Sequence, residues 1–158
     1  MKRITAEDID RIDHKLLALL QADGRISNTD LAQKVGLSQS ACLRRVQRLE
    51  RGGLIEGYGA RLNPAALGKG ETVFIEITLA SQSEAALDAF ERAAAASPDI
   101  LECHLMAGDY DYLLRVAVAD TADYERLHRK QLAAFPHVAR IRTHFALRRV
   151  ARRDAIEL

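Results

Sequence analysis

Two short amphipathic segments joined by a brief turn constrain the fold of this chain more than any other feature. The first segment begins after Ser27 and has apolar residues at Leu31 and Val35. Only the tripeptide Gly-Leu-Ser at 36–38 separates it from the second segment. Serine is favoured just before a helix and glycine just after one. Two short helices around a three-residue turn that contains glycine predict a helix-turn-helix.

A further amphipathic segment precedes this pair. Its apolar residues recur at helical spacing and form one stripe: Ile9, Ile12, Leu16, Leu17 and Leu20. Thr5 can cap this helix, and Gly24 can end it. Together with the helix-turn-helix, this segment predicts a small bundle of three helices. The alternative is a generic three-helix bundle, in which the helix-turn-helix would not contact DNA.

The second helix of the pair has an unusual outer face. Cys42, Val46 and Leu49 would face inward. The remaining side chains would face outward and are mostly polar or basic: Gln39, Ser40, Leu43, Arg44, Gln47 and Arg48. Arginine can pair with guanine, glutamine with adenine, and an apolar group can touch the thymine methyl. We therefore predict that this helix reads double-stranded DNA.

The charge distribution agrees with this interpretation. The net charge of the chain is +1, but residues 1–62 hold 11 Lys and Arg against 8 Asp and Glu. Residues 63–158 hold 12 against 14, so the two parts differ in sign. A solvated helix face is the alternative for a charge cluster alone, and the helix-turn-helix context favours DNA.

The segment Leu54–Leu62 follows the proposed recognition helix. Short β-type runs around Gly57 and Gly59 predict a hairpin, which would be the wing of a winged helix. Arg61 can reach a DNA phosphate from there or can be an ordinary exposed arginine. The residues Asn63-Pro64 and the glycines at 68 and 70 then indicate a linker.

The rest of the chain alternates between strand and helix patterns. Strands are predicted at 72–80, 100–107, 111–119 and 138–147, with helices at 83–96 and after Thr121. The order β-α-β-β-α-β is typical of a ferredoxin-like domain. We therefore predict an α+β chain with a winged helix-turn-helix at 1–62, a linker at 63–71 and a ferredoxin-like βαββαβ domain at 72–158. Its helices would cover one sheet face, and a second copy of the chain is the economical cover for the other.

These features together resemble the Lrp/AsnC (leucine-responsive/asparagine regulator) family of prokaryotic transcription factors. The similarity lies in IDHKLLALLQADGRIS, DLAQKVGLSQSACLRRVQRLERGGLI, MAGDYDYLLRVAV and RIRTHFAL. The charged N-terminal residues MKRITAEDIDRID lack the apolar region of a signal peptide, so we expect a cytoplasmic, nucleoid-associated protein. The resemblance implies a regulator that forms homodimers through its sheet, and tetramers or octamers from those dimers. It also implies an amino-acid effector bound between dimers.

The resemblance makes Gly108, Asp109, Tyr110 and Asp111 the effector loop, with His144 nearby. The residue types suit this role, because a glycine turn leaves backbone N–H groups open toward an α-carboxylate. Asp111 can accept a hydrogen bond from an α-ammonium group. The alternative is that these residues only form a hairpin turn. His144 departs from the residues common at its position, which leaves the effector's identity open.

No motif for catalysis is visible. The sequence contains no GxSxG, P-loop or HExxH motif, and its five histidines form no close ligand pair. We expect no enzymatic activity, no metal, no cofactor and no membrane partner. The alternative function is an amino-acid-sensing allosteric module that acts through protein contacts. The basic segment at 148–153 can extend the last strand or lie near DNA.

Overall fold

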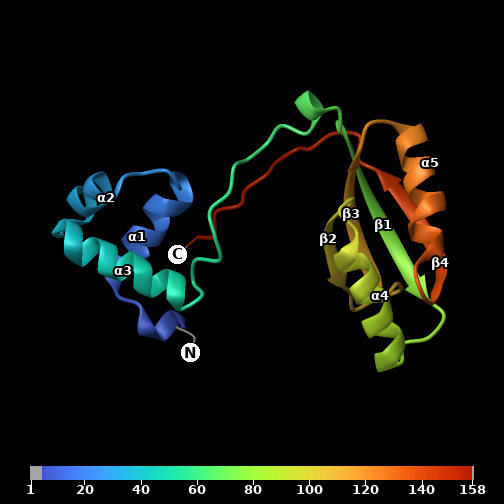
Figure 1. Ribbon diagram of the computed structural model, residues 1–158, viewed down its shortest axis with the longest axis horizontal. Coiled ribbons are helices and arrows are strands. Elements are labelled where there is room, and N and C mark those ends of the chain that lie inside the picture. The colour runs from blue at the N-terminus through green and yellow to red at the C-terminus, as the bar shows by residue number, and fades with distance from the viewer. Residues whose placement is uncertain (1–4, 158) are drawn as a thin grey trace. The chain divides into compact units, whose positions relative to one another are not determined.

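A computed structural model describes residues 5–157, which form two compact units (Figure 1). The helical unit comprises the chain up to Arg61 and the tail from Ala151 onward, and the sheet unit comprises Leu62–Val150. Residues 1–4 and 158, which belong to the first and last predicted domains, lie outside the described residues.

The helical unit contains the predicted helix-turn-helix. After a short 3-10 helix, Ala6–Asp8, come α1 (Arg11–Ala22), α2 (Asn28–Val35) and α3 (Gln39–Arg51). Gly36 has a φ of 74° at the end of α2, which is the left-handed conformation that glycine adopts at a helix C-terminus. Ser27 and Ser38 cap α2 and α3 as predicted, by accepting hydrogen bonds from the backbone N–H groups of Asp30 and Ala41.

The cap of α1 differs from the prediction. Thr5 caps only the 3-10 helix, and Asp10 caps α1. The Asp10 carboxylate accepts hydrogen bonds from the backbone N–H groups of Ile12 and Asp13, both at 2.9 Å. The apolar stripe of α1 packs against α2 and α3, and the buried core of this unit consists of Leu16, Leu17, Leu31, Ala32, Cys42, Val46 and Leu49.

The predicted wing is wrong, because the described segment Leu54–Leu62 contains no strand. The backbone N–H groups of Leu54 and Ile55 donate to the carbonyl of Leu49 and so close the end of α3. The side chains of Leu54 and Ile55 pack against the helical core. The N–H groups of Leu54 and Ile55 are therefore not available for a hairpin. The remaining residues of the segment are exposed.

The sheet unit has the predicted β-α-β-β-α-β order. Its elements are β1 (Glu71–Leu79), α4 (Glu84–Ala96), β2 (Ile100–Leu105), β3 (Tyr112–Val118), α5 (Thr121–Lys130) and β4 (Val138–Phe145), with short 3-10 helices at Ala65–Leu67 and Leu132–Ala134. The strands are antiparallel in the order β2-β3-β1-β4.

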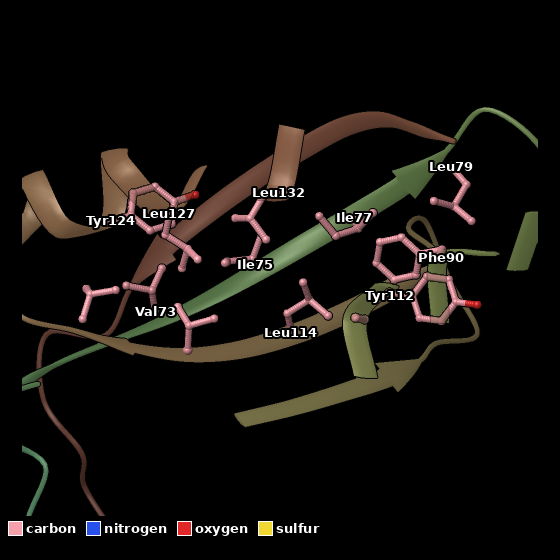
Figure 2. Close-up of a cluster of buried hydrophobic side chains, with 13 residues drawn as sticks. Val73, Ile75, Ile77, Leu79, Phe90, Tyr112, Leu114, Tyr124, Leu127 and Leu132 are labelled. Carbon is pink, nitrogen blue, oxygen red and sulfur yellow. The ribbon is translucent and has the colours of Figure 1, made fainter. Parts of the chain in front are cut away.

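The two sheet faces have different environments. Val73, Ile75 and Ile77 of β1 are fully buried and face Phe90 of α4 and Leu127 of α5 (Figure 2). The alternate residues Phe74 and Glu76 lie on the opposite face, because successive side chains of a strand point to opposite sides. No helix of the described sheet unit covers that face, and Phe74 keeps 36% of its surface exposed.

The tail also differs from the predicted arrangement. The last strand ends at Phe145, so the described part of the basic segment 148–153 does not extend it. The residues from Ala151 onward belong instead to the helical unit. The side-chain amide of Gln21 donates to the carbonyl of Ile156 at 3.0 Å and accepts from its N–H at 2.7 Å. These paired hydrogen bonds attach the tail to α1.

Candidate nucleic-acid interface and effector site

The outer face of α3 carries the predicted DNA-contacting residues. All of them are exposed: Gln39, Ser40, Leu43, Arg44, Gln47 and Arg48. Their spacing places them along one side of the helix, opposite the buried Cys42, Val46 and Leu49. Leu43, which is 47% exposed, lies on the same side of the helix.

Contacts at the start of α3 fix its position. The side-chain amide of Asn28 donates to the backbone carbonyl of Gln39 at 3.0 Å and links α2 to α3. Ser38 caps the helix, and its hydroxyl lies 3.3 Å from that of Ser40. Asn28 was missed by the sequence reasoning, since an exposed asparagine at the start of a helix gives no signal of its own.

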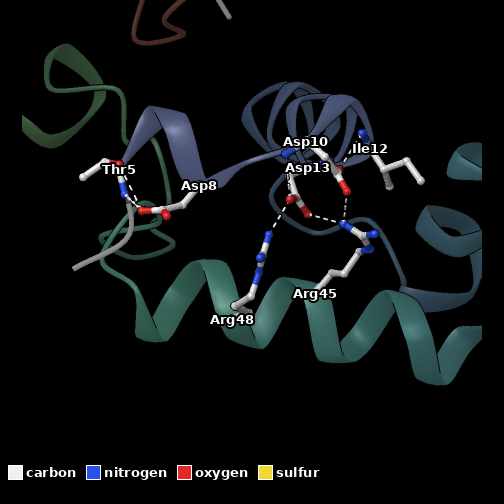
Figure 3. Close-up of polar contacts among 7 residues, drawn as sticks. All are labelled: Thr5, Asp8, Asp10, Ile12, Asp13, Arg45 and Arg48. Atoms are coloured by element: carbon white, nitrogen blue, oxygen red, sulfur yellow. Dashed lines mark hydrogen bonds and ion pairs between the residues drawn. The ribbon is translucent and has the colours of Figure 1, made fainter. Parts of the chain in front are cut away.

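Two arginines of α3, Arg45 and Arg48, pair with carboxylates at the start of α1 (Figure 3). Arg45 Nη1 lies 2.8 Å from Asp10 Oδ2 and 2.9 Å from Asp13 Oδ1. Arg48 Nη2 forms an ion pair with Asp13 Oδ2. Arg44 forms no ion pair with any of residues 5–157. Asp13 of α1 thus already pairs with the guanidinium of Arg48, and the contact of Arg48 with DNA stays a prediction.

Asp13 is the residue of this cluster that sequence reasoning missed. Its side chain is fully buried, and its Oδ2 also accepts a hydrogen bond from the Asp10 backbone N–H at 3.1 Å. The backbone N–H of Asp13 and the guanidinium of Arg45 hold the pKa of Asp10 below its ordinary value. Both carboxylates raise the pKa of Arg45. A signal existed, because a carboxylate next to the apolar stripe of a helix needs a partner.

Arg61 lies in the exposed segment after α3 rather than in a wing. Its side chain is 67% exposed, and its Nη2 atom lies 3.2 Å from Asp154 Oδ2 in the tail. The side chain therefore remains accessible to solvent although it is paired.

The loop between β2 and β3 contains the predicted effector residues. Gly108 and Asp109 are exposed, and Tyr110 is half-buried. The backbone N–H of Met106 donates to the carbonyl of Asp111 at 2.8 Å and closes the loop.

The Asp111 carboxylate, which was predicted to bind the effector, already has partners within the sheet unit. One oxygen accepts from the backbone N–H of Leu79 and the other from the side-chain amide of Gln82, both at 2.6 Å. The residue is only 6% exposed. This carboxylate therefore ties the loop to the end of β1, and its contact with a ligand's ammonium group stays a prediction.

Within one chain His144 does not lie near the loop, and its part in an effector pocket stays a prediction. It pairs with Phe74 across β1 and β4, whereas Tyr112, where the loop ends, pairs with Ile77. The two positions differ by about 10 Å along the strands. The His144 Nε2 atom lies 3.1 Å from Glu76 Oε1 on the uncovered sheet face.

A helix-turn-helix with an exposed recognition face, joined to a ferredoxin-like domain, defines a class of DNA-binding regulators. The AsnC-type helix-turn-helix domain matches residues 9–50, and the Lrp/AsnC ligand binding domain matches residues 72–156. The leucine-responsive regulatory protein of Escherichia coli (strain K12) is 44% identical over 149 residues, which are 94% of this chain and 91% of that protein.

Solved structures give the same result. An AsnC family regulator from Agrobacterium tumefaciens has 36% identity and a TM-score of 0.88 over 94% of this chain and 97% of its own. A regulator from Neisseria meningitidis, solved as its L-Met complex, has 29% identity and a TM-score of 0.88 over 94% and 96%. The chain belongs to the Lrp/AsnC family of transcriptional regulators.

Family membership confirms two predictions. The chain is a DNA-binding transcription regulator, and it is not an enzyme. Among the described residues, no helix is long and apolar enough to span a bilayer.

Proposed function

We propose that this regulator reads DNA through the outer face of α3 and responds to an amino acid. The observation that carries this proposal is the exposed face of α3, with Arg44 at its centre, which has no ion pair among residues 5–157. Gln39, Ser40, Leu43 and Gln47 would contact bases beside it. Arg61 would contact a phosphate, since its guanidinium is accessible. The site of action would be the nucleoid in the cytoplasm.

A gel-shift experiment tests the DNA-binding proposal. The duplex carrying the gene's own upstream region is compared with a random duplex at two salt concentrations. A symmetric dimer should prefer a pseudo-palindromic site with half-sites about 10 bp or a multiple apart. Phosphate contacts should weaken both complexes as salt rises. Failure to bind either duplex at low salt would contradict the proposal.

We also propose that a second copy of the chain covers the open sheet face. Phe74 lies at the centre of this face, between Arg115 on β3 and His144 on β4. An exposed aromatic ring on a sheet without a covering layer favours association. Dimers of this kind would then assemble into tetramers or octamers.

Phe74→Glu should convert this assembly into monomers. Within one chain, Arg115 and His144 flank position 74, so the fold should tolerate the new carboxylate. Burial of that carboxylate against a second copy would strongly disfavour association. Light scattering at micromolar concentration measures the mass, and Phe74→Leu serves as the control that should still associate. A dimer of unchanged stability for Phe74→Glu would place the interface elsewhere.

The effector site is proposed at the β2–β3 loop. The matched domain is a ligand binding domain, and the Neisseria regulator was solved with L-Met. The backbone N–H groups of Gly108, Asp109 and Tyr110 would hold the ligand's carboxylate. The exposed Asp109 carboxylate would accept from the ammonium group, and Asp111 would support the loop. A neighbouring dimer would complete the pocket.

A further inference from the structure

A compact group of charges joins the start of α1 to the middle of α3 (Figure 3). It consists of two carboxylates, from Asp10 and Asp13, and two guanidiniums, from Arg45 and Arg48. The ion pairs at Arg45 are 2.8 and 2.9 Å long. The group is neutral as a whole, so the charges of these two arginines are compensated within the protein.

Helix geometry shows what this compensation changes. Arg44 and Arg48 are four residues apart and lie on the same side of α3, whereas Arg45 is displaced by about 100°. Without the carboxylates, all of these side chains would be able to extend from the helix toward a bound duplex. With them, Arg45 and Arg48 turn toward α1, and their side chains are only 30% and 44% exposed.

We propose that Asp10 and Asp13 are specificity-determining residues, which hold Arg45 and Arg48 against α1 and so withhold two positive charges per recognition helix from the DNA backbone. This inference rests on the proposed DNA contact through α3. Binding to random DNA depends mainly on phosphate neutralisation, whereas base contacts distinguish one sequence from another. Fewer free arginines therefore weaken random binding more than specific binding.

Asp10→Asn tests this inference with little risk to the fold. Asparagine caps a helix about as well as aspartate, so the side-chain oxygen can still accept from the N–H groups of Ile12 and Asp13. The change removes the negative charge that holds Arg45 at 2.8 Å. Asp13 still pairs with Arg45 at 2.9 Å, so the guanidinium is held by one carboxylate charge instead of two and should exchange to a phosphate more readily.

The expected result concerns a random-sequence duplex. Asp10→Asn should bind it several-fold more tightly than the unmodified protein does. The slope of log K against log salt should become steeper by about 0.9 for each recognition helix that gains a phosphate contact. Affinity for the upstream duplex should rise less, so the ratio of specific to random binding should fall.

Two further variants test whether the change in slope comes from Arg45 or from the loss of any negative charge. Asp30→Asn removes one exposed carboxylate that bonds to Ser27 rather than to an arginine, and it should change the slope little. Arg45→Gln should leave the slope unchanged in the native background, and it should abolish the gain when it is combined with Asp10→Asn. Circular dichroism checks that each variant is folded.

A different pattern of binding would contradict this inference. If the carboxylates only brace arginines that already contact phosphates, Asp10→Asn should weaken both complexes equally. Arg45→Gln alone should then reduce the slope by about 0.9. Either outcome overturns the inference while leaving DNA binding through α3 intact. Failure of the unmodified protein to bind either duplex would instead contradict the proposed function on which the inference rests.

Discussion

Replacement of Arg44 by alanine should weaken binding to a specific site by about 1–3 kcal/mol, which is about 5- to 150-fold. Arg44 is exposed on the outer face of α3 and has no ion pair among the described residues. Its guanidinium is therefore free to form the bidentate contact that arginine makes with guanine. Titration of the upstream duplex measures the loss.

Two controls establish what kind of contact Arg44 makes. Arg44→Lys keeps the charge but loses the planar fork, so it should recover random binding and not specific binding. Arg92→Ala removes an exposed arginine from α4 and should have little effect. An equal loss on both duplexes would show that Arg44 contacts phosphate. Unchanged affinity would contradict the assignment of α3 as the recognition helix.

The repetitive parts of the fold could be predicted from the sequence because local periodicity determines them. The stripe from Ile12 to Leu20 identified α1, and the alternation around Ile75 identified β1 with the correct face inward. The prediction of a wing failed because the conformation of this segment depends on competition for backbone hydrogen bonds. The N–H groups of Leu54 and Ile55 donate to Leu49, and no residue pattern indicates that choice.

In the candidate sites, too, local spacing predicted some features and tertiary contacts determined the others. Helical spacing alone predicted that Arg44 and Arg48 would be exposed. It could not predict that Arg48 pairs with Asp13, because these residues are 35 positions apart in the chain. The same holds for Asp111 and Leu79, which are 32 positions apart. Pairing between distant polar groups depends on tertiary structure, so the residue types suggested free ligand-binding groups where the fold uses them internally.

Asp111→Ala should destabilise the sheet unit by about 3 kcal/mol. The change removes two hydrogen bonds to a carboxylate, from Leu79 N–H and from the Gln82 side chain, both 2.6 Å long. It also leaves the N–H of Leu79 without an acceptor in a buried strand end. A buried donor without a partner costs more than an average hydrogen bond contributes. Chemical denaturation followed by circular dichroism measures the change.

Asp111→Asn distinguishes the structural role from a ligand-binding role. The asparagine carbonyl can accept from Leu79 N–H, and its NH₂ group can donate to Gln82 once that amide rotates. Most of the stability should therefore return, although the negative charge is absent. If Asp111 bound the ligand directly, however, the ligand's ammonium group would lose its charged partner in this variant.

Because the carboxylate of Asp111 has internal partners instead, we expect Asp111→Asn to keep any amino-acid effect on DNA binding. The effector is first identified by the rise in melting temperature that ligand binding produces. Asp109→Ala should abolish that effect without loss of stability. If the folded Asp111→Asn protein no longer responds while Asp109→Ala does, Asp111 contacts the effector and its bonds to Leu79 and Gln82 are secondary.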